Sequence, residues 1–166
     1  MNVQQLNELS ENDAYQTFEN CCVAPRWVKR MVAARPFSSN ENVYETAQNI
    51  WNELTEDDYL AAFEGHPQIG DVSTLRAKYS STAEKAGHEQ SGMSVANEAV
   101  LNEMMTINKT YLTTFGFIFI VCATGKTAEQ MLTLIKNRIN NDREKELNIA
   151  AKEQAKITKI RLEKLL

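Results

Sequence analysis

The stretch AAFEGHPQIGD, residues 61–71, places one of the two histidines of the chain in a short, conformationally restricted loop. Gly65 and Gly70 allow the backbone to turn. Pro67 has a fixed φ angle and disfavours helical geometry at His66. An imidazole titrates near neutral pH, so it can donate or accept a proton in catalysis. The loop therefore predicts either a positioned acid or base at His66 or a histidine that only caps the preceding helix.

A second polar cluster and a distant arginine could complete such a site. Glu89 and Gln90 lie between two glycines in GHEQSG, where they form either binding groups or a solvated turn. Arg161 lies among apolar neighbours in ITKIRLEKLL. Its guanidinium could bind a carboxylate or a carbonyl, or its stem could pack on the core with the charge in water. The residues by themselves leave these alternatives open.

Other motifs with chemical potential have simpler interpretations. The GKT at 125–127 resembles the end of a phosphate-binding loop, but that motif needs a glycine where the chain has Ile120. Adjacent cysteines such as Cys21 and Cys22, in an amphipathic helix, are typical of small apolar core residues. Two histidines outside any known metal-ligand spacing predict no bound metal.

Composition narrows the class of protein. The 166 residues are 43% hydrophobic, enough for one domain to bury a core without disulfides. The net charge of −4 argues against a nucleic-acid partner. The longest apolar run, 117–123, is too short to span a membrane, and an odd set of three cysteines predicts reduced thiols. We therefore expect a soluble, unprocessed protein of the cytoplasm.

Most of the chain carries helix signals. Ser10 with Asp13 resembles a cap with an acidic first turn, and Pro25 suits the start of a second helix that Pro36 should end. Further helices are expected over 43–54, 55–65, 94–115, 127–141 and 142–166, with one or two helical pieces in 73–92.

The run FIFIVCA, Phe117–Ala123, is ambiguous because its β-branched and aromatic residues suit a strand. A lone strand would leave its backbone groups without partners, so a buried helix is predicted there. No repeat, linker or break in composition divides the chain. The prediction is a single compact all-α domain of about eight helices over residues 1–166.

Five segments, taken in order, resemble the decarboxylases of 2-oxo-4-hydroxy-4-carboxy-5-ureidoimidazoline (OHCU), which act in urate breakdown. The segments are RPF at 35–37, HPQIG at 66–70, EQSG at 89–92, FGFIFI at 115–120 and ITKIRL at 157–162. They extend over nearly the whole chain. The resemblance implies an all-helical, cofactor-independent homodimer that converts OHCU into (S)-allantoin with loss of carbon dioxide.

The resemblance also implies roles for individual residues. His66 matches the catalytic histidine of the family, and His88 receives no catalytic role. Two positions depart from the family pattern: Ala86 stands where a serine is frequent, and Ile118 where a proline is frequent. Contacts with the substrate are implied for Pro67, Glu89, Gln90, Phe119, Ile120, Val121, Cys122, Ala123 and Arg161.

Two other classes of function stay open at this level. A hydrolase of a small ureide would use similar polar groups, but it would release ammonia or a ring-opened acid instead of carbon dioxide. A non-catalytic helical binding protein would not depend on His66. Analysis of the product distinguishes these classes from a decarboxylase.

Overall fold

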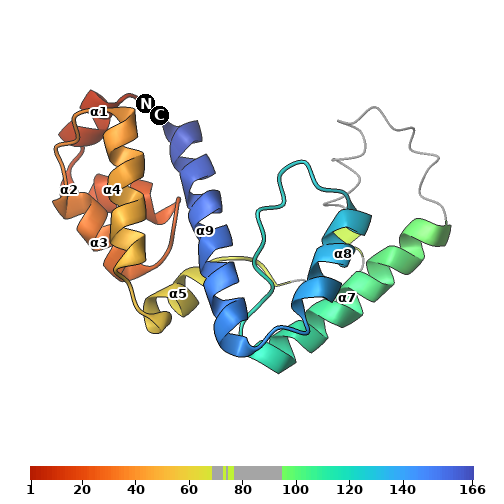
Figure 1. The fold of residues 1–166 in the computed structure, drawn as a ribbon. Coiled ribbons are helices and arrows are strands. Elements are labelled where there is room, and N and C mark those ends of the chain that lie inside the picture. The colour runs from red at the N-terminus through yellow and green to blue at the C-terminus, as the bar shows by residue number, and fades with distance from the viewer. Residues whose placement is uncertain (69–72, 74, 77–94) are drawn as a thin grey trace. The chain divides into compact units, whose positions relative to one another are not determined.

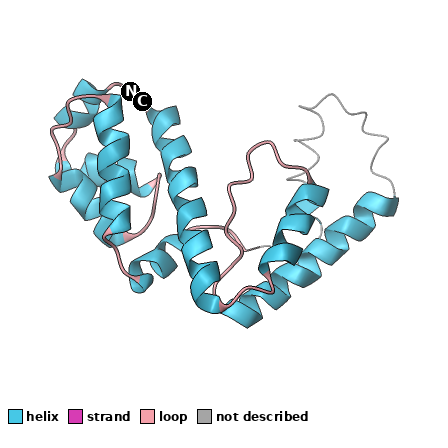
Figure 2. Cartoon of the chain, in the orientation of Figure 1, coloured by secondary structure: helices cyan, strands magenta, loops and turns pink. Residues whose placement is uncertain are grey.

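In the computed structural model, the chain folds into helices joined by turns and loops (Figures 1 and 2). The structure describes residues 1–68, 73, 75–76 and 95–166. Within these ranges there are eight helices and no strand, which confirms the all-α prediction. Nor is any helix in the described part of the chain long and apolar enough to cross a membrane. The helices are α1 (Val3–Glu8), α2 (Glu11–Glu19), α3 (Pro25–Ala33), α4 (Asn40–Asn52), α5 (Glu56–Phe63), α7 (Val95–Phe115), α8 (Ala128–Arg138) and α9 (Arg143–Leu165).

The cap expected at Ser10 is present, and local signals also mark the start of α8 and the end of α7. Ser10 Oγ accepts a hydrogen bond from the backbone N–H of Asp13 at 3.1 Å and begins α2. Thr127 and Gln130 form a reciprocal capping box at the start of α8. Gly116 follows α7 with φ of +80°, a conformation that glycine adopts without the clash a side chain would cause. Local signals thus place these helix ends correctly.

Helix α1 was not expected, although a signal for it is present. Asn2 and Gln5 form a capping box, because each side chain binds the backbone N–H of the other residue. Arg35 ties the end of this helix to the fold, since its Nη1 donates to the carbonyl oxygens of Leu6 at 3.1 Å and Leu9 at 2.7 Å. The short helix is stabilised by tertiary contacts as well as by its cap.

Residues 117–123 are irregular, so the prediction of a buried helix there was wrong. Arg138 supplies the backbone partner that a strand or helix would otherwise provide, because its Nη1 donates to the carbonyl oxygen of Ile120 at 2.7 Å. Lys126 Nζ donates to the carbonyl oxygen of Cys122 at 2.7 Å. A buried segment needs partners for its polar groups but no regular structure, and here cationic side chains satisfy two of its carbonyls.

Contacts divide the chain into two compact units. The first comprises Met1–His66 and Ile149–Leu166, and the second Pro67–Asn148. The chain returns to the first unit through α9, which lies beside α4 (Figure 1). The indole N–H of Trp51 on α4 donates to the carbonyl oxygen of Ala151 on α9 at 3.0 Å. The core of the first unit includes the fully buried side chains of Leu6, Phe18, Trp27, Met31, Phe63 and Leu162.

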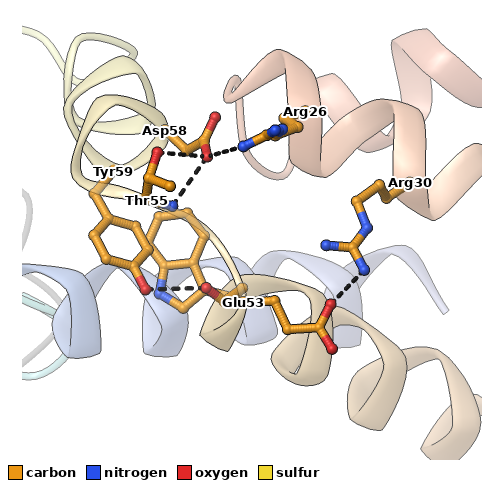
Figure 3. Close-up of polar contacts among 7 residues, drawn as sticks. Arg26, Arg30, Glu53, Thr55, Asp58 and Tyr59 are labelled. Carbon is orange, nitrogen blue, oxygen red and sulfur yellow. Dashed lines mark hydrogen bonds and ion pairs between the residues drawn. The ribbon is translucent and has the colours of Figure 1, made fainter.

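The start of α5 is fixed by polar contacts within the first unit (Figure 3). Asp58 Oδ2 accepts hydrogen bonds from the N–H of Thr55 at 3.0 Å, from the hydroxyl of Thr55 at 3.1 Å and from Arg26 at 3.3 Å. Burial raises the pKa of Asp58, but these donors outweigh it and hold the pKa below its usual value. Tyr59 donates to the carbonyl oxygen of Trp51 at 3.1 Å. These contacts orient the helix that leads to His66.

Candidate active site

His66 lies just beyond α5, in the turn predicted from the sequence. Its backbone N–H donates to the carbonyl oxygen of Phe63 at 3.1 Å, and its side chain is half-buried. Gly65 makes this turn possible because of a close approach: an added Cβ would lie 2.4 Å from Cγ2 of Val23. The backbone that carries His66 is therefore held against the loop after α2.

Gln154 is a side-chain partner of His66. Its Oε1 lies 2.5 Å from His66 Nε2, and its Nε2 donates to the hydroxyl of Thr158 at 3.1 Å. Gln154 is 1% exposed, so its amide has little access to water. The sequence analysis missed this residue. A signal was available, because Gln154 and Thr158 are polar side chains at i and i+4, on one face of a helix that also carries Arg161 at i+7.

Arg161 is half-buried on the same helix and contacts the loop after α2. Its Nη1 donates to the carbonyl oxygen of Cys21 at 3.2 Å. The rise of an α-helix places residues seven positions apart at about 10 Å along the axis. The first unit thus carries an imidazole in the turn after α5, and a primary amide and a guanidinium on one face of α9.

Burial disfavours the thiolate form of the two cysteines beside Arg161. Burial raises the pKa of Cys21 to about 11, and the positive charge of Arg161 opposes this only in part. Burial likewise raises the pKa of Cys22 to about 11. Both side chains are therefore thiols at neutral pH, whereas nucleophilic attack requires the thiolate. This agrees with their interpretation as core residues.

The predicted backbone site at 119–123 lies in the second unit. Ile120 is buried, while Phe119, Val121, Cys122 and Ala123 are half-buried. The ring of Phe119 packs 4.5 Å from the guanidinium carbon of Arg138, which also binds the Ile120 carbonyl. The carbonyl oxygen of Ala123 also accepts a hydrogen bond from the backbone N–H of Lys126 at 3.0 Å, so several contacts hold this irregular backbone in place.

Arg138 is held by a buried polar cluster that sequence reasoning did not identify. Glu146 is fully buried, and its Oε1 accepts from Arg138 Nε at 2.5 Å and from the Tyr111 hydroxyl at 2.6 Å. Asn141 donates to Glu146 Oε2 at 3.1 Å. Burial and the Glu146 carboxylate raise the pKa of Tyr111 above its usual range. The cluster satisfies a buried carboxylate and aims Arg138 at Ile120.

Of the remaining predicted site residues, the structure describes Pro67 but not Glu89 or Gln90. Pro67 is exposed and is the first residue of the second unit. Glu89 and Gln90 lie outside the described residues, as do His88 and Ala86. Of the predicted residues, the first unit contains His66 and Arg161, and the second contains Pro67 and 119–123.

The side chains of the first unit can perform proton transfer and anion binding. His66 can exchange a proton with a ligand, and a guanidinium suits a planar carboxylate or carbonyl. Neither role requires a thiol nucleophile. The geometry thus fits a reaction driven by proton movement and by binding of a polar substrate.

Comparison with known proteins shows which family this chain resembles. The family model for OHCU decarboxylase matches residues 7–163. The uric acid degradation bifunctional protein TTL of Arabidopsis thaliana is 37% identical over 146 residues, which are 87% of this chain and 45% of that protein. The 2-oxo-4-hydroxy-4-carboxy-5-ureidoimidazoline decarboxylase of Amia calva is 25% identical over 168 residues, covering 100% of this chain and 95% of that protein.

The fold agrees with that of a solved relative. A crystal structure of OHCU decarboxylase in the presence of (S)-allantoin has a TM-score of 0.72 and 37% identity to this chain, and the match covers 89% of this chain and 95% of that one. The chain spans less than half the length of the Arabidopsis bifunctional protein. Because the family model extends over both compact units, the chain belongs to the OHCU decarboxylase family.

Proposed function

We propose that this protein decarboxylates OHCU stereospecifically to (S)-allantoin, with His66 as the acid/base group. The observation that carries the proposal is the family match over 7–163, which includes a histidine whose backbone and ring are both hydrogen-bonded. The related OHCU decarboxylase crystallised in the presence of (S)-allantoin supports the product.

The substrate carries its own electron sink. When the bond between the ring carbon and the carboxylate breaks, carbon dioxide leaves and the electron pair moves toward the adjacent ring imine, whose nitrogen takes a proton. The hydroxyl then loses its proton as the neighbouring ring carbon gains one, which forms allantoin. The net reaction consumes one proton and needs no external electron acceptor. The protein's task is to orient the ring, to move protons and to stabilise the shifting charge.

Roles follow for the other site residues within this proposal. Arg161 binds a carbonyl or carboxylate of the substrate, because its planar fork can form two parallel hydrogen bonds. The backbone of 119–123 holds the ring. Glu89 orients His66 or binds the ureido N–H groups, Gln90 supplies amide hydrogen bonds, and Pro67 lines the site. An Arg161→Lys variant whose KM equals that of the wild type contradicts the role of Arg161.

The test follows the circular dichroism of allantoin formed from freshly generated OHCU. We expect the wild type to produce the S enantiomer faster than the spontaneous reaction, and His66→Asn to lower kcat by about 10²-fold or more, the range for loss of an acid/base group. Glu64→Gln, an exposed change two residues away, is the matched control. A folded His66→Asn protein with nearly full activity contradicts the role of His66. Slow, racemic product with every protein contradicts the decarboxylase itself.

We also propose that residues 1–166 act as one functional domain, as a homodimer in the cytoplasm. The family match across both units supports the single domain. Free thiols at all three cysteines suit a reducing compartment. The family resemblance supports the dimer. Light scattering coupled to size exclusion measures the oligomeric state, and fractionation of the source cells measures the location. A monomer at micromolar concentration, or recovery in an oxidising compartment, contradicts these proposals.

A further inference from the structure

Arg138 binds its partners with different nitrogens of one guanidinium. Its Nε donates to Glu146 Oε1 at 2.5 Å, and its Nη1 donates to the carbonyl oxygen of Ile120 at 2.7 Å. Arg138 is 8% exposed and Glu146 is 0% exposed, so water screens this pair little. The Tyr111 hydroxyl completes the cluster, because it donates to Glu146 Oε1 at 2.6 Å and accepts from Arg138 Nη2 at 3.5 Å. The direction of the guanidinium is therefore fixed at each of its nitrogens.

The same cluster holds the residue before Ile120 through its ring. The Phe119 ring lies 4.5 Å from the guanidinium carbon of Arg138, and the Tyr111 ring packs edge-on against it at 5.3 Å. A cation over a ring face and two rings in this arrangement attract each other. Phe119 and Ile120 are consecutive residues of the irregular segment 117–123. Side chains from α7, α8 and α9 thus determine the path of the backbone at these two positions.

Stability alone does not explain why this cluster is charged. Taking two charges out of water costs about as much as their attraction returns, so apolar side chains of similar volume can stabilise a fold equally well. Apolar side chains cannot, however, donate a hydrogen bond to the Ile120 carbonyl. The feature that only Arg138 supplies is a donor of fixed direction.

We propose that Arg138 is a positioning residue for the decarboxylation. Together with Glu146 and Tyr111, it holds the backbone of Phe119 and Ile120 in the conformation that orients the substrate ring. Arg138 acts through this backbone, and no contact with the substrate is required of it. The inference rests on the proposed function, in which residues 119–123 hold the ring.

The contact with Ile120 can be measured without substrate. Ile120 and Val121 form the one isoleucine–valine pair in the sequence, so ¹³C in the isoleucine carbonyls and ¹⁵N in the valines yields a single NMR signal for this peptide bond. In Arg138→Lys, one ammonium nitrogen replaces the separate donors of the guanidinium, and it should stay with the buried Glu146 carboxylate. We expect the carbonyl signal to move to a lower chemical shift, as when a carbonyl loses a hydrogen-bond donor. An unmoved signal in folded Arg138→Lys overturns the proposal.

The rate and the stereochemistry of the reaction measure the effect on substrate. We expect Arg138→Lys to lower kcat/KM by about ten- to a hundredfold, the range that a small displacement of bound substrate causes. The enantiomeric excess of (S)-allantoin, followed by circular dichroism, should also fall, because a loosely held ring is protonated on both faces. A folded variant whose signal has moved, but whose kcat/KM and enantiomeric excess match those of the wild type, overturns the proposal.

An apolar replacement of the whole cluster separates positioning from stability. Arg138→Met/Glu146→Leu/Tyr111→Phe removes both charges and the hydroxyl together, so it leaves no buried charge without a partner. We expect this protein to unfold at a higher urea concentration than Glu146→Met, yet to lose as much kcat/KM as Arg138→Lys. If activity returns together with stability, the role of the cluster is purely structural and the proposal is overturned. Arg138→Lys alone decides the question if the triple variant does not fold.

Lys136→Met/Glu103→Gln is the matched control. It removes an ion pair between α8 and α7 whose side chains are 48% and 51% exposed, and exposed pairs contribute little. The Ile120 signal, kcat/KM and enantiomeric excess should match those of the wild type. Failure of the proposed function has a different signature, in which the wild type forms no (S)-allantoin while the Ile120 signal still depends on Arg138. That result contradicts the decarboxylase and confirms the contact.

Discussion

Gly65 illustrates how a single residue can set the position of a catalytic side chain. A Cβ at this position would lie 2.4 Å from Cγ2 and 3.0 Å from Cγ1 of Val23. A valine side chain is stiff, so the loop that carries His66 would have to move. We expect Gly65→Ala to lower the free energy of unfolding by about 1–3 kcal/mol, as overpacking does, and to lower activity as well. Urea denaturation measures the first effect.

A double variant identifies the cause of that loss. Val23→Ala removes both methyl groups that the new Cβ would meet, so the Gly65→Ala/Val23→Ala protein should be more stable than the sum of the two single changes predicts. Strictly additive losses would show that the contact between residues 65 and 23 is not responsible.

The buried thiols give the protein a specific alkaline sensitivity. The pKa of Cys21 and that of Cys22 rise from 9.0 to about 11 in the folded state. Folding therefore favours the protonated thiol, and the stability that this contributes is present below about pH 9 and lost as the pH rises toward 11. We expect the free energy of unfolding to fall over this interval, and to fall less in a Cys21→Ala/Cys22→Ala protein.

The comparison with the double variant is necessary because buried tyrosines also titrate at high pH. Burial and the Glu146 carboxylate raise the pKa of Tyr111, which acts in the same direction as the thiols. Urea denaturation at pH 8 and pH 10 of both proteins isolates the cysteine contribution. If the free energy of unfolding depends on pH equally in the two proteins, the buried thiols make no contribution to the alkaline sensitivity.

At the scale of elements, the irregular segment 117–123 depends on side chains from α8 and α9. Arg138 binds the Ile120 carbonyl and is paired with Glu146, which is fully buried. Removing one member of a buried ion pair leaves the other charge unpaired. We expect Glu146→Met to lower the free energy of unfolding by about 3–5 kcal/mol.

Glu144→Gln is the matched control, because Glu144 is exposed on the first turn of the same helix. Its free energy of unfolding should stay within about 0.5 kcal/mol of that of the wild type, as is usual for surface changes. Thermal or urea denaturation compares the two variants. Similar stability of Glu146→Met and Glu144→Gln would show that the buried cluster does not stabilise the segment.

At the scale of the whole molecule, the first compact unit is assembled from both ends of the chain. Residues 149–166 supply the Ala151 carbonyl bound by Trp51, the amide bound by His66 and the fully buried Leu162. We expect a protein truncated after Asn148 to lose cooperative unfolding of the first unit, because apolar surface and buried donors lose their partners.

Circular dichroism during heating, together with the fluorescence of the two tryptophans, measures this loss, since Trp27 and Trp51 both lie in the first unit. Adding a peptide of residues 149–166 in trans should restore part of the native fluorescence. A truncated protein that unfolds with the same midpoint and the same fluorescence change as the full chain would show that the first unit does not depend on residues 149–166.

The sequence by itself determined the helical class, most helix ends and the family. Caps such as Ser10 with Asp13, and the glycine after α7, act over three or four residues, so they can be read locally. The ordered motifs of the resemblance identified the family that the comparisons show. His66 also stood out, because Gly65 allows the chain to turn before it and Pro67 restricts its backbone in any context.

Only the tertiary structure decided which groups meet. His66 and Gln154 are 88 positions apart, and nothing local to either residue predicts their contact. The path of 117–123 likewise depends on Arg138, whose guanidinium replaces the partners that a helix would have provided. The physical reason is the same in both places: a buried polar group must be satisfied, but any segment that packing brings near can satisfy it.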